Sequence, residues 1–241
     1  MKSIYFFYGY QGDDPVQSVA NAHCTFHLFD DFLGNSLDHT KWETYGAGSL
    51  HIAESKVLIQ SQDTDMILRS KKAFTMPVIA EMLMTTSHGK YVSFALVQEK
   101  NFQEGYALAL DHPQEKMRLS YLDPEWFSPC GGYGFLPDVD HAQAGHTEGI
   151  WFIASITANT IMGHWPSGSL MQENIIILQE KVNLALGTLA CRNELHASAA
   201  MEVDWLRIRN LAITSPQLWM GTEQLTDGAE LLHAPFLIPE I

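Results

Sequence analysis

Short strand-like segments separated by turn residues run along the whole sequence, and this feature limits the fold more than any other. Many of them alternate apolar and polar residues with a period of two, and no long helical period interrupts the series. They lie at residues 3–8, 25–31, 49–53, 56–60, 66–69, 78–86, 91–98, 106–111, 117–122, 150–157, 160–165, 175–179, 184–190 and 201–208. Strands of this length and spacing predict an all-β protein, a two-sheet antiparallel β-sandwich.

Two of these segments, residues 91–97 and 106–110, alternate large and small side chains. Such strands are typical of central positions in a sheet, with the bulk on one face and the small residues on the other. The small residues either leave a concave groove on their face or let two sheets approach closely. The sequence leaves both interpretations open.

The charge of the chain and the length of its apolar runs exclude two classes of partner. Charged residues make up 17% of the 241 residues, and the net charge is −14 without any cluster of Lys or Arg. Nucleic-acid binding is not expected, because neutralising phosphates requires a basic stripe. Insertion into a membrane is not expected either, because the sequence lacks an apolar run of the required length.

The cysteines and histidines show no metal-binding or disulfide pattern. Cys24, Cys130 and Cys191 form no CxxC pair, and the odd count leaves at least one free thiol. The 11 histidines are scattered without the helical spacing and partner carboxylate of a metal motif. We therefore expect buried thiols and histidines with structural or surface roles.

Two regions differ from the strand pattern. Residues 123–149 form a long stretch rich in Pro, Gly and aromatic side chains, which predicts a functional loop packed over a sheet edge or face. Residues 214–241 carry three prolines and several apolar residues, which predicts an arm laid on its own domain or on a neighbour. The expected organisation is an N-terminal strand and linker at 1–24, a sandwich domain at 25–213 and a C-terminal arm at 214–241.

Three stretches resemble concanavalin A-like jelly rolls of the laminin-G and laminarinase-like group. Residues 29–42, with Phe-Asp-Asp-Phe, Leu-Asp and Lys-Trp, are similar to the opening strand and turn of that group. Residues 150–156 with the following Ala-Asn-Thr-Ile-Met are similar to its central strand-turn-strand unit, and residues 187–209 to its closing strand. The resemblance covers about residues 25–211 and implies a jelly-roll sandwich.

The N-terminus carries a second resemblance. Residues 4–10, 20–21 and 25–26 resemble the end of a small domain of unknown function that often precedes such jelly rolls in secreted and surface proteins of prokaryotes. Only its last strand is expected here, so the chain is expected to begin within that pattern. The resemblance implies an extracellular or surface location, with a virion as the alternative, although the N-terminus lacks a convincing signal-peptide cleavage site.

The resemblance also bears on catalysis. Catalytic members of the group carry Glu-x-Asp-x-x-Glu on one strand, and here the best match is Glu202, Asp204 and Arg207. An arginine does not donate a proton at neutral pH, so it cannot replace the acid that a retaining glycosidase needs. The matching strand is also the closing one, whereas the catalytic strand lies centrally. We therefore predict a non-enzymatic domain, with a glycoside hydrolase as the weaker alternative.

A structural calcium ion is a further implication of the resemblance, because many members bind one between the opening and closing strands. The expected ligands are Asp30, Asp31 and Asp204, since carboxylate oxygens suit Ca²⁺. The alternative is that these carboxylates pair with neighbouring basic residues or cap turns.

Carbohydrate recognition is the main functional prediction. Sugars stack on exposed aromatic rings flanked by groups that hydrogen-bond to hydroxyls. The aromatic side chains least explained by strand burial are Trp126, Tyr133, His164 and Trp165, and the nearby carboxylates are Asp123 and Glu125. We therefore expect a glycan or polysaccharide as the partner of a recognition or adhesion module.

The alternative function is structural. The domain would then be a subunit of an extracellular filament, surface layer or virion, contacting other subunits through the arm at 214–241. The low charge and the apolar arm favour this alternative. A sugar binder predicts a wet groove lined by aromatic residues, whereas a building block predicts an arm and loop buried between chains.

Overall fold

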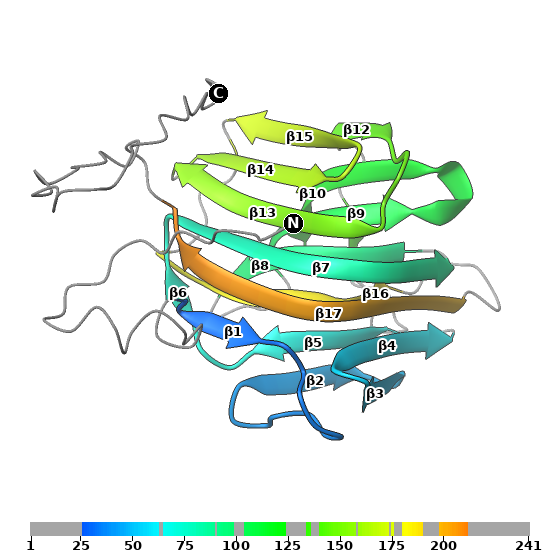
Figure 1. Ribbon diagram of the computed structural model, residues 1–241. Coiled ribbons are helices and arrows are strands. Elements are labelled where there is room, and N and C mark those ends of the chain that lie inside the picture. The colour runs from blue at the N-terminus through cyan, green and yellow to red at the C-terminus, as the bar shows by residue number, and fades with distance from the viewer. Residues whose placement is uncertain are drawn as a thin grey trace, which may run out of the picture. The chain divides into compact units, whose positions relative to one another are not determined.

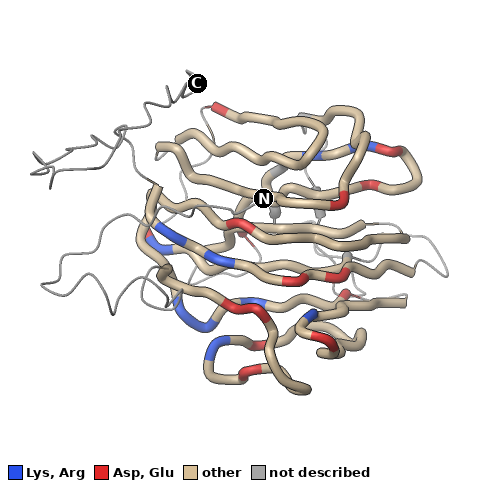
Figure 2. Tube along the Cα trace, in the orientation of Figure 1, with Lys and Arg blue, Asp and Glu red and all other residues tan. Residues whose placement is uncertain are grey.

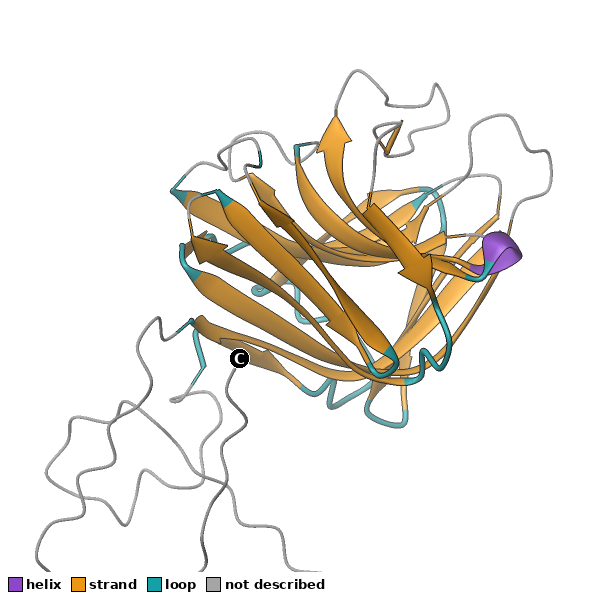
Figure 3. Ribbon diagram, turned by 90° about the horizontal axis from the view of Figure 1, so that it is seen from above, coloured by secondary structure: helices purple, strands orange, loops and turns teal. Residues whose placement is uncertain are grey.

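The computed structural model describes residues 26–62, 65–89, 91–98, 104–123, 134–135, 140–157, 159–173, 175, 180–189 and 198–211. These residues form two antiparallel sheets in two layers, which confirms the predicted all-β sandwich (Figure 3). In the described part of the chain, the helical element is the 3-10 helix η1 (His112–Gln114). No helix among those residues is long and apolar enough to cross a membrane.

The first sheet, called sheet A, has eight strands in the order β15-β14-β13-β7-β17-β4-β3, with β1 also paired to β17 (Figure 1). Its strands are β1 (Leu28–Asp30), β3 (Ser49–Ala53), β4 (Lys56–Gln62), β7 (Val78–Gly89), β13 (Gly149–Thr157), β14 (Thr160–Trp165), β15 (Gly168–Glu173) and β17 (Ser198–Asn210). The closing strand β17 is therefore central in this sheet, between β7 and β4.

The second sheet, called sheet B, has nine strands in the order β11-β10-β9-β8-β16-β5-β2, with β12 paired to β10 and β6 paired to β16. Its strands are β2 (Trp42–Gly46), β5 (Met66–Ser70), β6 (Phe74–Thr75), β8 (Tyr91–Gln98), β9 (Gly105–Asp111), β10 (Lys116–Asp123), β11 (Gly134–Phe135), β12 (Asp140–Gln143) and β16 (Lys181–Leu189). The alternating segments at residues 91–97 and 106–110 are neighbours here, as β8 and β9.

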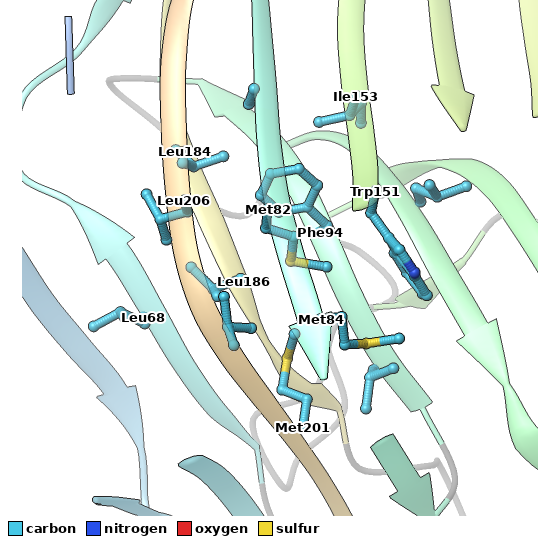
Figure 4. Packing of buried hydrophobic residues seen from close by; sticks show 14 of the residues in the cluster. Leu68, Met82, Met84, Phe94, Trp151, Ile153, Leu184, Leu186, Met201 and Leu206 are labelled. Atoms are coloured by element: carbon cyan, nitrogen blue, oxygen red, sulfur yellow. The ribbon is translucent and has the colours of Figure 1, made fainter. Parts of the chain in front are cut away.

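The core lies between the two sheets. Figure 4 shows side chains from sheet A packed against side chains from sheet B. The labelled residues are Met82, Met84, Trp151, Ile153, Met201 and Leu206 from sheet A and Leu68, Phe94, Leu184 and Leu186 from sheet B. All of them are buried, so the inward positions of the period-two pattern supply most of the apolar burial that drives folding.

The observed boundaries of several strands agree closely with the ranges predicted from the sequence. β3, β8 and β14 have the predicted bounds, and β7 and β17 extend the predicted ones by a few residues. The sequence did not predict β2, β6 or β15, nor the short strands β11 and β12 within the stretch expected to be a loop. The predicted strand at residues 175–179 lies outside the described residues except for Ile175. The N-terminal strand and the C-terminal arm also lie outside them.

Candidate functional site

The outer face of β17 carries the residues of the hydrolase-like motif. Glu202, Asp204 and Arg207 are partly exposed, while Val203 and Leu206 point into the core. The pairing with β7 shifts register between Glu202 and Trp205, which marks a β-bulge. Charged residues of both signs follow β17 and β7 (Figure 2).

Glu202 is held by two neighbours on this face. The Thr85 hydroxyl donates a hydrogen bond to Glu202 Oε1 at 2.5 Å, and Lys56 Nζ lies 2.9 Å from the same oxygen. The bond from Thr85, followed by the one from Lys56, lowers the pKa of the Glu202 carboxyl below its ordinary value. Glu202 is thus kept ionised, as a fixed carboxylate rather than a proton donor.

Arg207 stands where the hydrolase motif has its second Glu, and its surroundings explain its role. Its Nε lies 2.6 Å from Glu81 Oε2, and its guanidinium carbon is 5.0 Å from the ring centroids of both Phe26 and Trp205. Glu81 also accepts a longer contact of 3.5 Å from Arg209. Arg207 therefore joins β17 to β7 through its ion pair with Glu81, while its aromatic contacts are to Trp205 of β17 and to Phe26 before β1.

The outer face of sheet B shows whether the small residues of β8 and β9 serve the close approach of the two sheets. Phe94 and Leu96 belong to the main core, whereas Ala95 and Ala107 form a separate cluster with other residues on the opposite face of the sheet. Close approach of the two sheets is therefore not the reason for these small residues. Tyr45 and Tyr91 pack against this second cluster, whose members are at most 4% exposed.

Polar side chains flank the second cluster on neighbouring strands. Arg69 binds Asn183 Oδ1 at 2.9 Å and Glu43 Oε1 at 3.0 Å, and it lies 3.4 Å from the hydroxyl of Tyr45. Burial raises the pKa of the Tyr45 hydroxyl above its ordinary value, so that hydroxyl stays protonated. These side chains thus form a hydrogen-bonded network beside the second cluster on the outer face of sheet B.

An open hollow lies instead at one end of sheet A, where β3, β4, β17 and β7 are neighbours. We call it the end hollow. It has a volume of about 420 Å³. Its described lining consists of Ala47, Gly48, Ser49, Gln60, Ser61, Gln62, His88, Ser198, Ala199 and Ala200. This volume falls in the range of about 300–1,000 Å³ that is typical of small-ligand pockets.

The register of four strands builds the end hollow. Ser49 is paired with Gln60, Gln60 with Ala200, and Ala200 with His88, so the four residues form one row across the sheet. Paired residues share a face, and Ser49, Gln60 and His88 are exposed on it while Ala200 is buried. The small Ala200 therefore provides a floor between the longer Gln60 and His88 side chains.

Two glycines permit the close approach that shapes the end hollow. Gly89 ends β7 with φ +88, and a Cβ on it would lie 2.0 Å from the carbonyl oxygen of Ser198. A Cβ on Gly48 would lie 2.3 Å from the carbonyl oxygen of Gln60. Only glycine fits such contacts, so these positions bring β7 to β17 and the β2–β3 turn to β4.

The chemistry of the end hollow is polar. Amide, hydroxyl and imidazole side chains line it, and none of its described lining residues is Asp, Glu, Lys or Arg. The Ser61 hydroxyl is buried and has no hydrogen-bond partner among the described residues. Such groups both donate and accept hydrogen bonds, which is the property that a ligand rich in hydroxyls requires.

A second imidazole lies beside the end hollow. His112 Nε2 is 3.1 Å from the hydroxyl of Ser87, next to His88 in β7. Burial lowers the pKa of His112, and the nearby His88 contributes in the same direction. The lowered pKa favours a neutral His112 at neutral pH.

The structure describes only some of the residues predicted to bind sugar. Trp126, Tyr133 and Glu125 lie outside the described residues. Asp123 ends β10, where its backbone pairs with Gly134 of β11. The prediction therefore remains open for these four residues.

His164 and Trp165 are adjacent in β14 and face opposite ways. The His164 ring stacks on Phe152 with centroids 4.8 Å apart, on the outer face of sheet A. Trp165 is 1% exposed, and its indole N–H donates to the carbonyl of Ala144 at 2.6 Å. The prediction that Trp165 stacks on a sugar is wrong, because its ring is part of the core.

The three predicted calcium ligands are not brought together. Asp30 is buried and accepts hydrogen bonds from the backbone N–H of Phe32 and the indole of Trp42, with Lys41 Nζ 3.6 Å away. Asp204 lies on the outer face of β17. Among the described residues, no group of three or more His, Cys, Asp or Glu side chains could hold a metal ion.

Sequence reasoning did not identify the end hollow. Its lining comes from segments far apart in the chain, and no lining residue belongs to a recognisable motif. The one signal was the polar run Gln60-Ser61-Gln62, in which Ser61 takes an inward position that a strand usually gives to an apolar residue.

Comparison with known families supports the N-terminal resemblance. The model of a family described as a domain of unknown function (DUF2341) matches residues 2–45. The match agrees with the N-terminal resemblance and extends over β1 into β2. No curated protein matches the sequence.

Solved structures with the same fold act on or bind glycans. An endo-β-1,3-glucanase from Pyrococcus furiosus aligns with a TM-score of 0.55 and 11% identity, over 76% of this chain and 93% of that one. LamA from Zobellia galactanivorans, bound to laminaritriose and laminaritetraose, aligns at 0.54 and 12%, over 76% and 99%. A β-agarase A bound to oligoagarose aligns at 0.54 and 14%, over 75% and 90%. These alignments confirm the concanavalin A-like jelly-roll fold.

These neighbours contradict the prediction of a non-enzymatic domain. Several are enzymes that cleave polysaccharides, so the chain has a fold on which glycoside hydrolases are built. The prediction relied on Arg207 in a single strand. The identity of one residue in β17 does not decide the chemistry of the other strands, and that is why the inference failed.

Proposed function

We propose that this domain binds an oligosaccharide or polysaccharide chain and that the end hollow holds one of its sugar units. The observation that carries the proposal is the row Ser49, Gln60, Ala200 and His88, which surrounds a hollow of about 420 Å³ with hydrogen-bonding side chains over an alanine floor. The fold shared with glycan-binding structures supports the same conclusion.

The lining suits a sugar ring for a physical reason. A sugar presents hydroxyls around its edge, and each buried hydroxyl needs a donor or an acceptor to replace water. The amide of Gln60 supplies both, and the imidazole of His88 and the hydroxyl of Ser49 do the same. The methyl group of Ala200 offers an apolar surface to the C–H groups of the ring.

The experiment introduces a bulky side chain at the end hollow and compares its effect on glycan binding with that of the same side chain placed outside the hollow. Ser49→Trp places a large ring at the rim, and Ala53→Trp places the same ring on the same exposed face of β3, about 13 Å further along the strand. Isothermal titration calorimetry with laminaritetraose and with oligoagarose measures the affinity of each variant. Release of reducing ends from both sugars is followed in parallel.

The expected result is that Ser49→Trp weakens binding at least about tenfold, whereas Ala53→Trp leaves the affinity within about twofold of the starting protein. Gln60→Ala provides a second variant, because Gln60 is exposed and its truncation spares the core. Loss of one hydrogen bond should weaken binding about fivefold. Equal binding by all variants would place the glycan elsewhere, and no binding of any glycan tested would overturn the proposal.

Several expectations remain predictions beside this proposal. They are a structural calcium ion, contacts to other subunits through residues 214–241, and an extracellular or surface location. The adhesion role within a larger surface protein belongs with them. Each concerns groups or partners beyond the end hollow.

A further inference from the structure

The charged side chains around the end hollow bear on whether its sugar ligand is neutral or anionic. We infer that the end hollow selects a neutral sugar unit and rejects units that carry a carboxylate or a sulfate. This inference rests on the proposed function, because it concerns the ligand of the same site. It follows from what lines the end hollow and from how the nearest charged groups are engaged.

The first step is the absence of Lys and Arg from the described lining. Serine, glutamine, alanine and glycine residues surround the end hollow, with His88 at the β7 side. An anionic group that leaves water for such a site loses hydration and gains no ammonium or guanidinium partner. In contrast, uncharged hydroxyls exchange water for the amide and hydroxyl partners at little net cost.

The second step is the engagement of Lys56, on a strand that lines the end hollow. Lys56 lies on β4, four residues before Gln60, and its Nζ is 2.9 Å from Glu202 Oε1. The same carboxylate accepts the Thr85 hydroxyl. Lys56 is therefore already neutralised, and using it for an anionic sugar would leave Glu202 without its ionic partner.

The third step is the position of Glu202 itself. It lies two residues after Ala200 on β17, so both side chains project from the same face of the strand. An anionic sugar at the end hollow would approach this carboxylate along the strand. The net charge of −14 acts in the same direction over longer distances.

The test compares one oligosaccharide in two charge states. The neutral probe is laminaritetraose, and the anionic probe is the same chain with its primary hydroxyls oxidised to carboxylates. Calorimetry gives Kd for both with the full chain. We expect the neutral probe to bind at least about tenfold more tightly. We also expect its Kd to be constant between about 20 and 500 mM NaCl, because no ion pair forms.

A variant that gains affinity for the anionic probe provides a second test of the inference. Ser198→Lys introduces a cation at the exposed rim of the end hollow, and Ala53→Lys introduces the same charge on sheet A outside it. Ser198→Lys should tighten binding of the oxidised probe about two- to fivefold. Ala53→Lys should leave it unchanged, which controls for the change in net charge.

The outcomes separate this inference from the proposed function. Tight binding of the oxidised probe by the starting protein, equal to or above that of the neutral probe, overturns neutral selectivity while glycan binding stands. An equal gain from Ser198→Lys and Ala53→Lys also overturns it, because the charge would then act without contact at the end hollow. Failure of both probes to bind overturns glycan binding by these chains and the inference with it.

Discussion

The indole nitrogen of Trp42 donates a 2.6 Å hydrogen bond to Asp30, and this bond ties β2 of sheet B to β1 of sheet A. Both side chains are almost completely buried, and Phe32 packs beside the indole with ring centroids 6.3 Å apart. The opening motif that resembles the jelly-roll group thus has a structural function. It fixes the first strand of one sheet against the first strand of the other.

Replacing Asp30 by Ala should therefore destabilise the sandwich strongly. The substitution leaves the buried indole N–H of Trp42 and the backbone N–H of Phe32 without their acceptor. We expect a loss of about 3 kcal/mol in the free energy of unfolding, measured by urea denaturation. Asp31→Ala is the control, since its side chain is partly exposed, and it should change stability by less than about 0.5 kcal/mol. Equal losses in both variants would contradict this account.

Glu202 predicts a pH dependence of stability. The pKa of its carboxyl is lowered in the folded protein, so its contribution is present above the ordinary value of 4.5 and is lost as the pH falls through the folded value. Glu202→Gln should be less stable than the starting protein by about 0.5–1 kcal/mol at pH 7. This difference should shrink as the pH falls below 4.5. Unfolding curves in urea between pH 7 and pH 3.5 measure it.

A matched control is Glu173→Gln, at the exposed end of the edge strand β15. It removes the same charge without removing a bond from Thr85 or Lys56, so its stability should follow the starting protein at every pH. A gap for Glu202→Gln that stays constant down to pH 3.5 would show that the ionised carboxylate is not what stabilises the fold.

The sequence predicts strands well where one face is buried, and the exceptions have physical causes. β15 is an edge strand with no buried residue, so it lacks the apolar alternation that reveals a strand. The β3–β4 hairpin turns at Glu54 and Ser55, both with positive φ, where Asn or Gly would be the usual signal. For β8 and β9, the many apolar residues indicated that the strands are buried. They did not indicate which face of the sheet is open.

The candidate site was less predictable than the fold. Trp165 was predicted to bind sugar because it was among the aromatic residues that strand burial explained least, yet the period of two in β14 turns it inward. The row from Ser49 to His88 depends on the pairing of β3, β4, β17 and β7, and the partners are up to 140 residues apart, as Gln60 and Ala200 show. Register of this kind is set by the whole sheet, so a single sequence does not reveal it.

Trp165 provides a direct test of the corrected role. Trp165→Phe keeps most of the ring volume but leaves the carbonyl of Ala144 without the indole donor. We expect a loss of about 1–3 kcal/mol in unfolding free energy, with the Kd for laminaritetraose unchanged. A large loss of glycan affinity in a variant that remains folded would return Trp165 to the binding site.

Gly89 links the backbone of sheet A to the end hollow, and its substitution should affect both stability and binding. Ala at this position has to adopt φ +88 and also displace the carbonyl oxygen of Ser198, 2.0 Å from the new Cβ. Gly34→Ala is the matched control, because Gly34 has φ +107 but nothing lies within 4 Å of its Cβ. Backbone strain of about 1–3 kcal/mol is common to both variants, so the steric contact is what distinguishes them.

We therefore expect Gly89→Ala to lose more unfolding free energy than Gly34→Ala, by at least about 1 kcal/mol. Because Ser198 moves with the start of β17, the same variant should also bind laminaritetraose more weakly, by about three- to tenfold. Gly34→Ala should bind with the starting affinity, since Gly34 lies outside the lining of the end hollow. Calorimetry at a temperature where both variants are fully folded separates the loss of glycan affinity from the loss of stability. Unchanged affinity in Gly89→Ala would mean that the spacing between β7 and β17 does not shape the site.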